Sequence, residues 1–209
     1  MITLAFDTAL DKMYVTLKKD SEILTSEVVE TTETKYHSAY LISTIEEVLN
    51  RHNLKPADVD LIGINIGPGS FTGIRACTTV ARIMAQQLNI KVVGVSSLEI
   101  LSKINKTDKP SLATLDARKN SAYLLVNNEI KGAVPIEELK KIIESKDYFV
   151  ITDNKLQPVT GGVSYQQNSY PLGEILAELA EIKINEVDGD WRKLLPLYIQ
   201  PAAVHMTKK

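Results

Sequence analysis

The sequence predicts an α/β protein of two related lobes, with the second lobe reduced. The first half alternates short β-type runs with longer amphipathic runs, in the order expected for three strands followed by helix, strand, helix, strand and helix. Part of this order repeats after a polar, proline-ended segment at residues 105–110. We therefore expect an N-terminal α/β lobe at residues 1–105 and a smaller C-terminal α/β lobe with a tail at residues 106–209.

Each predicted element follows from its local residue pattern. Short runs rich in apolar and β-branched residues predict strands in the first half at residues 4–7, 13–18, 23–30, 60–66 and 91–95. Longer runs with apolar residues at helical spacing predict helices there at residues 36–53, 72–88 and 97–104. In the second half the same patterns predict strands at residues 113–116, 123–126 and 148–152 and helices at residues 137–145 and 172–182.

The two halves share a local signature. In each half the first strand ends on an aspartate, Asp7 or Asp116, and a tyrosine seven residues later, Tyr14 or Tyr123, opens the second strand. Two lobes of this design resemble the actin-like and sugar-kinase-like ATPase fold, which is built from RNase H-like lobes. In enzymes of that fold the two aspartates face a cleft and manage the metal and phosphates of ATP.

Composition limits the class of protein. The chain carries a formal net charge of −2 with scattered basic residues, whereas a nucleic-acid binder normally concentrates basic residues on one surface. No apolar run approaches the roughly 18 residues of a membrane span, and the N-terminus leads directly into a strand. We therefore expect a cytoplasmic protein with no signal peptide and no membrane contact. The single cysteine, Cys77, lies in an apolar helical run, which favours a small buried residue over a nucleophile.

A glycine-rich turn separates the fourth predicted strand from the helix that follows it. Gly67 and Gly69 permit backbone angles closed to other residues, and Pro68 fixes one φ angle between them. Ser70 or Thr72 can cap the helix. A helix N-terminus after such a turn is a common way to hold phosphate. A tight turn without a ligand explains the residues equally well, because the spacing matches neither the Walker A motif nor the dinucleotide fingerprint.

Several segments in this order resemble the bacterial TsaB (YeaZ) family. They are Phe6-Asp7-Thr8-Ala9, Gly67-Pro68-Gly69-Ser70-Phe71-Thr72-Gly73-Ile74-Arg75, Gly94-Val95-Ser96-Ser97-Leu98, Leu115-Asp116-Ala117-Arg118 and the closing Leu195-Pro196-Leu197-Tyr198-Ile199. The resemblance is dense in the first half of the chain and loose in most of the second. Each piece alone is weak, and the combination is specific.

The resemblance implies a subunit needed to make threonylcarbamoyladenosine, the modified base beside the anticodon of tRNAs that read codons beginning with A. In that pathway the transferase is a paralogue called TsaD, and TsaB docks on it and activates it together with a small ATPase, TsaE. The resemblance also implies a homodimer when the partner is absent. It implies no cofactor bound by this chain alone, ATP or ADP at the interface with partner subunits, and tRNA held mainly by those partners.

The metal site of the paralogue has no counterpart in this sequence. The resemblance places its two iron- or zinc-binding histidines at Ser97 and Leu101, and a hydroxyl and an isobutyl group cannot replace imidazoles as ligands. His37 and His52 lie about 22 Å apart by helical rise, and His205 is in the tail. We therefore expect no metal site, no catalytic residue and a non-catalytic role.

The expected cleft residues look like remnants of a nucleotide site. The set is Asp7, Thr8, Gly67, Gly69, Asp116 and Arg118. No glycine follows Asp7 closely, although a phosphate-binding hairpin needs small residues so that N–H groups can close on the phosphate. Arg118 would place a charge beside Asp116, which suggests a structural ion pair as readily as nucleotide chemistry. Plain turn capping and a working ATPase are the alternatives.

The helix at residues 72–88 carries a wider apolar arc than one sheet can cover. Its apolar residues occupy roughly 200° of the circumference, whereas packing on one sheet needs little more than 100°. The excess must meet either the neighbouring helix or a second protein, and it lies around Ala76, Val80, Ile83 and Gln87. In the family these two helices dock the paralogue, and on the first helix the expected interface residues are His37, Tyr40, Thr44 and Glu47.

Two other functions fit the same fold. Relatives of the paralogue have been called glycoproteases, which suggests a metallopeptidase-like hydrolase, and free-standing ATP-dependent kinases share the fold. Stoichiometric iron or zinc would indicate the hydrolase, and tight binding of ATP and magnesium by the isolated chain would indicate the kinase.

Overall fold

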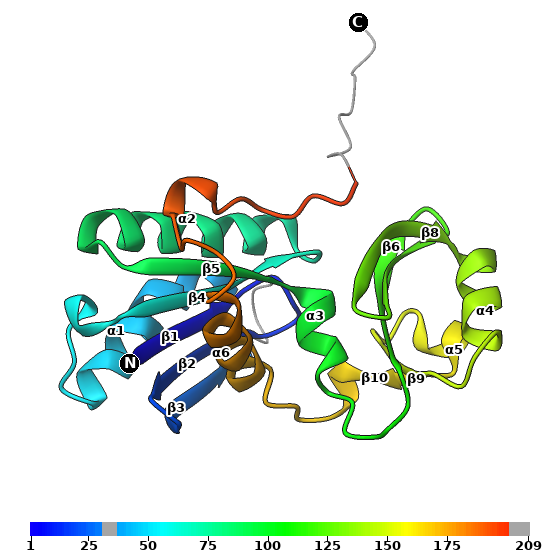
Figure 1. The fold of residues 1–209 in the computed structure, drawn as a ribbon, viewed down its shortest axis with the longest axis horizontal. Helices are drawn as coiled ribbons and strands as arrows, with labels where there is room; N and C mark the ends of the chain where they lie inside the picture. The colour runs from blue at the N-terminus through cyan, green and yellow to red at the C-terminus, as the bar shows by residue number, and fades with distance from the viewer. Residues whose placement is uncertain (31–36, 201–209) are drawn as a thin grey trace, which may run out of the picture.

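The computed structural model describes residues 1–30 and 37–200, except for the side chains of residues 37 and 38. The chain forms two five-stranded sheets, each flanked by helices (Figure 1). Within the described ranges, none of the helices combines the length and the apolar character that crossing a membrane requires. The predicted α/β class with two lobes is confirmed.

The first sheet has the strand order β3-β2-β1-β4-β5. Its strands are β1 (Ile2–Asp7), β2 (Met13–Lys19), β3 (Glu22–Val29), β4 (Leu61–Gly67) and β5 (Lys91–Ser96). The first three strands pair antiparallel, and β1, β4 and β5 pair parallel. The carboxyl ends of β1, β4 and β5 therefore meet at one edge of the sheet, where the glycine-rich turn begins.

The second sheet repeats this plan. Its strands are β6 (Ser111–Arg118), β7 (Ser121–Val126), β8 (Glu129–Pro135), β9 (Phe149–Thr152) and the two-residue β10 (Val163–Ser164). Their order is β10-β9-β6-β7-β8, which is the order of the first sheet when the strands are counted within each half. The internal repeat predicted from the sequence is confirmed. Sequence patterns missed β8 and β10.

Helices cover the outer face of each sheet. α1 (Leu41–Arg51), which follows the 3-10 turn η1 (His37–Tyr40), and α2 (Phe71–Leu88) pack on the first sheet. α4 (Ile136–Glu144) and the short α5 (Gln157–Thr160) pack on the second. Further 3-10 turns are η2 (Pro56–Asp58), η3 (Tyr165–Gln167) and η4 (Trp191–Lys193).

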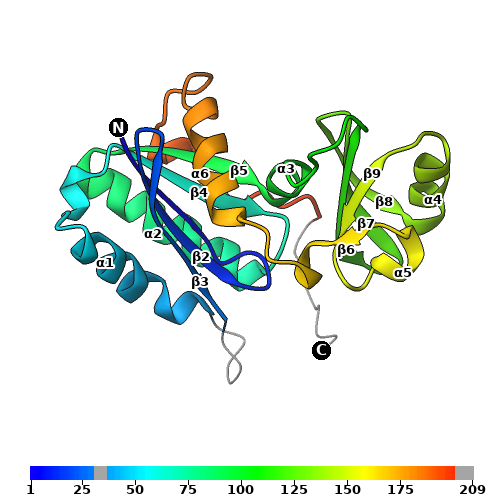
Figure 2. The same cartoon turned by 90° about the horizontal axis from the view of Figure 1, so that it is seen from below.

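The two halves exchange helices across a shared core. α3 (Ser97–Ser102), from the first half, packs on β6 and β7 of the second sheet as well as on β4 and β5 of its own, whereas α6 (Leu172–Lys183), from the second half, packs on the first sheet. Both views show α3 between the two sheets (Figures 1 and 2). One apolar cluster contains residues of both sheets and of both helices. Residues 106–209 were expected to form the second lobe and a tail, and the structure adds that α6 from this range packs on the first sheet.

α6 lies very close to the first sheet. A Cβ atom on Gly63 of β4 would meet the Cβ of Ala180 at 2.6 Å, so a glycine is needed at this crossing. Lys18 of β2 forms an ion pair with Glu181 of α6, and the same carboxylate accepts a hydrogen bond from Thr3 Oγ1 at 2.8 Å. Apolar packing and a mostly buried ion pair thus hold α6 in place.

The chain then returns along α2 as an extended segment, residues 190–200, which we call the strap (Figure 1). Trp191 lies under the guanidinium of Arg82, and Leu194 is buried in the core of the first lobe. The N–H of Leu197 donates to Ile66 O at 2.8 Å, and Ile199 packs against the shared core. His205 lies outside the described residues.

Candidate functional site

The glycine-rich turn is covered by the chain's own backbone. The N–H of Ser70 donates to Ala9 O at 2.7 Å, and the Ser70 hydroxyl accepts from Gly73 N at 3.2 Å as the cap of α2. A Cβ on Gly69 would meet Ala9 O at 2.3 Å, and one on Gly73 would meet Thr8 O at 1.7 Å. The β1–β2 turn therefore presses directly onto the start of α2. These glycines permit close backbone packing, which is the ligand-free alternative for this turn.

Thr8 belongs to the same packed unit. Its hydroxyl donates to Gly73 O at 2.7 Å, and its N–H donates to the sulfur of Cys77 at 3.1 Å. Cys77 is fully buried, and burial raises the pKa of its thiol well above the ordinary value. The thiol is therefore protonated at neutral pH and acts as a packing residue.

Asp7 lies at the end of β1 and is only 1% exposed. Its carboxylate accepts hydrogen bonds from Ala9 N at 2.5 Å and from Asn65 Nδ2 at 2.9 Å. Burial raises the pKa of Asp7 to about 6, because desolvation of the charged form outweighs these hydrogen bonds. At neutral pH the side chain is a buried carboxylate that is stabilised by uncharged donors.

Asn65 connects this carboxylate to α3. Its Oδ1 atom accepts from Gly67 N at 2.8 Å and from Ser97 Oγ at 2.9 Å. Gly67 has a φ of +102°, a conformation that side-chain-bearing residues rarely adopt. The ends of β1 and β4 and the first turn of α3 are thus joined in one polar network.

Ser97 and Leu101, the two positions where the resemblance leads us to expect the histidines of the paralogue, are both fully buried. The Ser97 hydroxyl takes part in the network around Asn65, and Leu101 packs in the shared core. Among the described residues, His, Cys, Asp and Glu side chains form no group of three or more that could hold a metal ion. This chain thus uses both positions for packing and hydrogen bonding.

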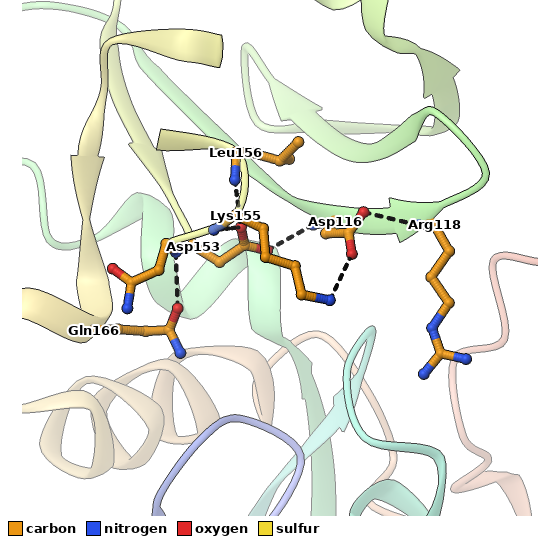
Figure 3. A network of polar contacts seen from close by, with 7 residues as sticks. Asp116, Arg118, Asp153, Lys155, Leu156 and Gln166 are labelled. Carbon is orange, nitrogen blue, oxygen red and sulfur yellow. Dashed lines mark hydrogen bonds and ion pairs between the residues drawn. The ribbon is translucent and has the colours of Figure 1, made fainter. Parts of the chain in front are cut away.

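Asp116, near the end of β6, lies in a different network (Figure 3). Its Oδ2 atom pairs with Lys155 Nζ at 2.9 Å, and its Oδ1 atom accepts from the backbone N–H of Arg118 at 3.0 Å. Its own N–H donates to Asp153 Oδ2 at 2.7 Å. The guanidinium of Arg118 points away from this carboxylate (Figure 3). The structural ion pair between Arg118 and Asp116, one of the two alternatives suggested by the sequence, is not among the ion pairs of the described residues, and Lys155 supplies the positive charge beside Asp116.

The expected docking face of α2 is left partly open by the chain itself. Ile83 is 55% exposed and Gln87 is exposed, whereas Val80 and Ala76 are half-buried. The strap contacts a different side of α2, through Arg82 and Phe71. α1 packs chiefly on β2, and the 3-10 turn η1 approaches α2.

The expected interface residues next to α1 are divided between open and half-buried positions. Tyr40 is 49% exposed at the start of α1, Thr44 is half-buried, and the exposed Glu47 forms an ion pair with Arg51 at 2.8 Å. His37 begins η1, and its side chain lies outside what the structure describes. Among the expected interface residues whose side chains are described, Tyr40 is the large exposed one, and Ile42 of α1 beside it is 67% exposed.

Comparison with known proteins places these features in a family. A model described as "TsaD: tRNA N6-adenosine threonylcarbamoyltransferase" matches residues 22–143, more than half of the chain. The chain belongs to this family. Several of its curated relatives are TsaB proteins, and the resemblance to TsaB (YeaZ) inferred from the sequence is confirmed.

Two relatives illustrate the similarity to TsaB. The "tRNA threonylcarbamoyladenosine biosynthesis protein TsaB" of Bacillus subtilis is 30% identical over 124 residues, which are 59% of this chain and 53% of that protein. The protein of the same description in Haemophilus influenzae is 28% identical over 125 residues, which are 57% of this chain and 51% of the relative. The matched part thus spans about half the length of these relatives.

Solved structures support the fold. "YeaZ from Pseudomonas aeruginosa" superposes with a TM-score of 0.76 at 24% identity and covers 95% of this chain and 100% of its own. A ROK hexokinase from Thermus thermophilus gives a TM-score of 0.50 at 10% identity, over 88% of this chain and 100% of that one. The actin-like, sugar-kinase-like architecture expected for two such lobes is confirmed.

Sequence patterns missed several residues of the two polar networks. Asn65 carried a recognisable signal, since it is the one polar residue in the run Ile64-Asn65-Ile66 at the end of a buried strand. Asp153 and Lys155 carried none, because their partner Asp116 lies in a strand far away in the sequence.

Proposed function

We propose that this chain is a non-catalytic partner subunit that docks and activates a TsaD-like transferase in the threonylcarbamoyladenosine modification of tRNA. The observation that carries the proposal is the open face of α2, around Ile83. An isoleucine more than half exposed in the middle of an 18-residue helix keeps apolar area in water, and burying it in an interface recovers that hydrophobic free energy.

The surroundings of Ile83 suit a helical partner. Val80 and Ala76 lie one and two turns from Ile83 on the same side of α2, and both are only half-buried by the chain itself. Tyr40 adds an aromatic side chain from η1, which approaches α2. Aromatic anchors beside an apolar stripe are typical of interface centres. A partner that lays its own helices against α1 and α2 would cover this face.

The non-catalytic part of the proposal is supported by the cleft residues. Ser97 and Leu101 are both buried in structural contacts, and the β1–β2 turn fills the space in front of the glycine-rich turn. Asp7 and Asp116 have separate structural partners, Asn65 and Lys155. We therefore propose that ATP or ADP binds at the interface with partner subunits, which include a TsaE-like ATPase. In this proposal tRNA is bound mainly by those partners. A homodimer through the same helix face would form when the partner is absent.

The test is co-elution of the chain with the transferase of its own organism, measured for Ile83→Asp. A buried aspartate in an apolar interface has no counter-charge, so we expect heterodimer formation and tRNA modification by the mixture to be lost. The matched control is Ile182→Asp, because Ile182 is 57% exposed and lies on α6, away from this face. Co-elution of Ile83→Asp with unchanged affinity would contradict the docking face. Modification of tRNA by this chain alone, or stoichiometric iron or zinc in the purified chain, would contradict the non-catalytic role.

A further inference from the structure

An exposed aromatic pair lies at the start of α2, about three turns along the helix from Ile83. Phe71, the first residue of α2, and Tyr198 of the strap have ring centroids 5.5 Å apart, with an interplanar angle of 32°. The two side chains are 48% and 47% exposed. Two residues far apart in the sequence thus hold large apolar surfaces together in water, where a ligand that stacks on rings can reach them.

Arginines frame this aromatic pair. The guanidinium of Arg75 lies over the Phe71 ring, 5.2 Å from its centroid. In the described part of the chain, arginine ion pairs are formed by Arg51 and Arg192, and Arg75 and Arg118 form none. A chain with a net charge of −2 therefore keeps two uncompensated guanidinium groups in this region.

The second arginine, Arg118, ends β6 in the second lobe. The end of the strap lies beside the β6 side of that lobe in both views, and Ile199 packs into the core that the two lobes share (Figures 1 and 2). Arg118 and Lys119 have φ angles of +62° and +48°, which are strained for residues with side chains. The Arg118 side chain extends away from Asp116 (Figure 3). The guanidinium of Arg118 thus points away from the carboxylate of Asp116 and forms none of the ion pairs found among the described residues.

We propose that Phe71, Arg75, Arg118 and Tyr198 form an aromatic–arginine surface that contacts the RNA substrate directly. The phenyl and phenol rings would stack on unpaired bases, and the guanidinium groups would contact phosphates or stack on bases. This combination fits a single-stranded part of a polyanion better than a protein, because the surface couples π-faces to uncompensated positive charge. The inference rests on the proposed function, which brings tRNA to the complex, and it adds a contact made by this subunit itself.

The experiment measures tRNA binding by the reconstituted complex with the transferase, at several salt concentrations, for Arg75→Ala, Arg118→Ala and Tyr198→Ala. We expect each variant to weaken binding about fivefold or more. The arginine variants should also reduce the slope of log affinity against log salt by about one each. Arg192→Ala is the control, because that exposed arginine also lies in the strap and is already paired with Asp190. Its affinity for tRNA should match that of the unchanged complex.

Each alternative outcome has a definite meaning. Unchanged tRNA affinity and salt slope in all three variants would overturn the proposed RNA contact. Loss of the heterodimer in these variants would also overturn it and would show that the surface docks a protein. Failure of the unchanged chain to form the complex would contradict the proposed function instead. In that case the same variants, compared for tRNA binding by the isolated chain at low salt, decide the RNA contact separately.

Discussion

The Nδ2 atom of Asn65 donates to the carboxylate of Asp7 at 2.9 Å and joins the ends of β4 and β1. No lysine or arginine shares this contact among the hydrogen bonds and ion pairs of the described residues. The charged form of Asp7 is therefore held by dipoles alone inside the protein. Such a group makes stability depend on pH.

We expect the free energy of unfolding to fall as pH rises from about 4 to about 6. The pKa of Asp7 is raised from 3.8 to about 6 in the folded protein, so in this window the folded state binds more protons than the unfolded state. The contribution of Asp7 to the free energy of unfolding is fully present below its unfolded pKa and is lost as pH rises through its folded pKa. This contribution amounts to about 3 kcal/mol. Urea unfolding at pH 4, 5, 6 and 7, compared with Asp7→Asn, measures it. A slope in Asp7→Asn equal to that of the unchanged chain would contradict the assignment.

We expect Gly73→Ala to destabilise the protein by at least about 3 kcal/mol or to prevent folding. Its Cβ would lie 1.7 Å from Thr8 O, and backbone on both sides leaves no flexible atom to move. Gly161→Ala is the control, since that Cβ meets nothing within 4 Å and only the positive φ of +64° is strained. The control should lose about 1 kcal/mol. Equal melting temperatures for the two variants would show that the β1–β2 turn does not press on α2.

We expect Lys18→Met to destabilise the protein by about 3 kcal/mol, because Glu181 would keep a mostly buried charge without its counter-charge. The double variant Lys18→Met, Glu181→Met should recover much of this loss, since both buried charges are then gone. Lys131→Met removes an exposed pair with Glu129 and should change stability little. Denaturant unfolding checks all three. A double variant no more stable than Lys18→Met would mean that the ion pair itself, rather than the unpaired charge, carries the energy.

The repeat of two lobes could be predicted from the sequence because hydrophobic periodicity and the aspartate–tyrosine spacing are local signals. The packing of α3 and α6 on the sheet of the other half could not be predicted from the sequence. The apolar residues of α6 predict a buried helix, but they do not say which of two similar sheets it covers. The close approach at Gly63 and Ala180 decides that choice, and it joins residues more than a hundred positions apart.

For the candidate site, too, the features with a local sequence signal could be predicted and the contacts between distant segments could not. Asp7 and Thr8 follow one predicted strand, and Gly67 and Gly69 belong to the turn after another, so each pair could be singled out from its own local pattern. The parallel pairing of β1 and β4 brings the two pairs together at one edge of the sheet. The sequence suggested Arg118 as a partner of Asp116 because the two are close in sequence, whereas the Arg118 side chain points away from Asp116 and Lys155 arrives from another element. Contacts between distant segments depend on the folded backbone rather than on spacing.

The position of α6 has a consequence during protein synthesis. The five strands of the first sheet have all left the ribosome long before Leu172–Lys183 is made. Until then, one face of that sheet has no cover and its apolar side chains meet water or a chaperone. The amino-terminal half therefore cannot finish folding when it emerges, because its first sheet is completed by a helix that is translated much later.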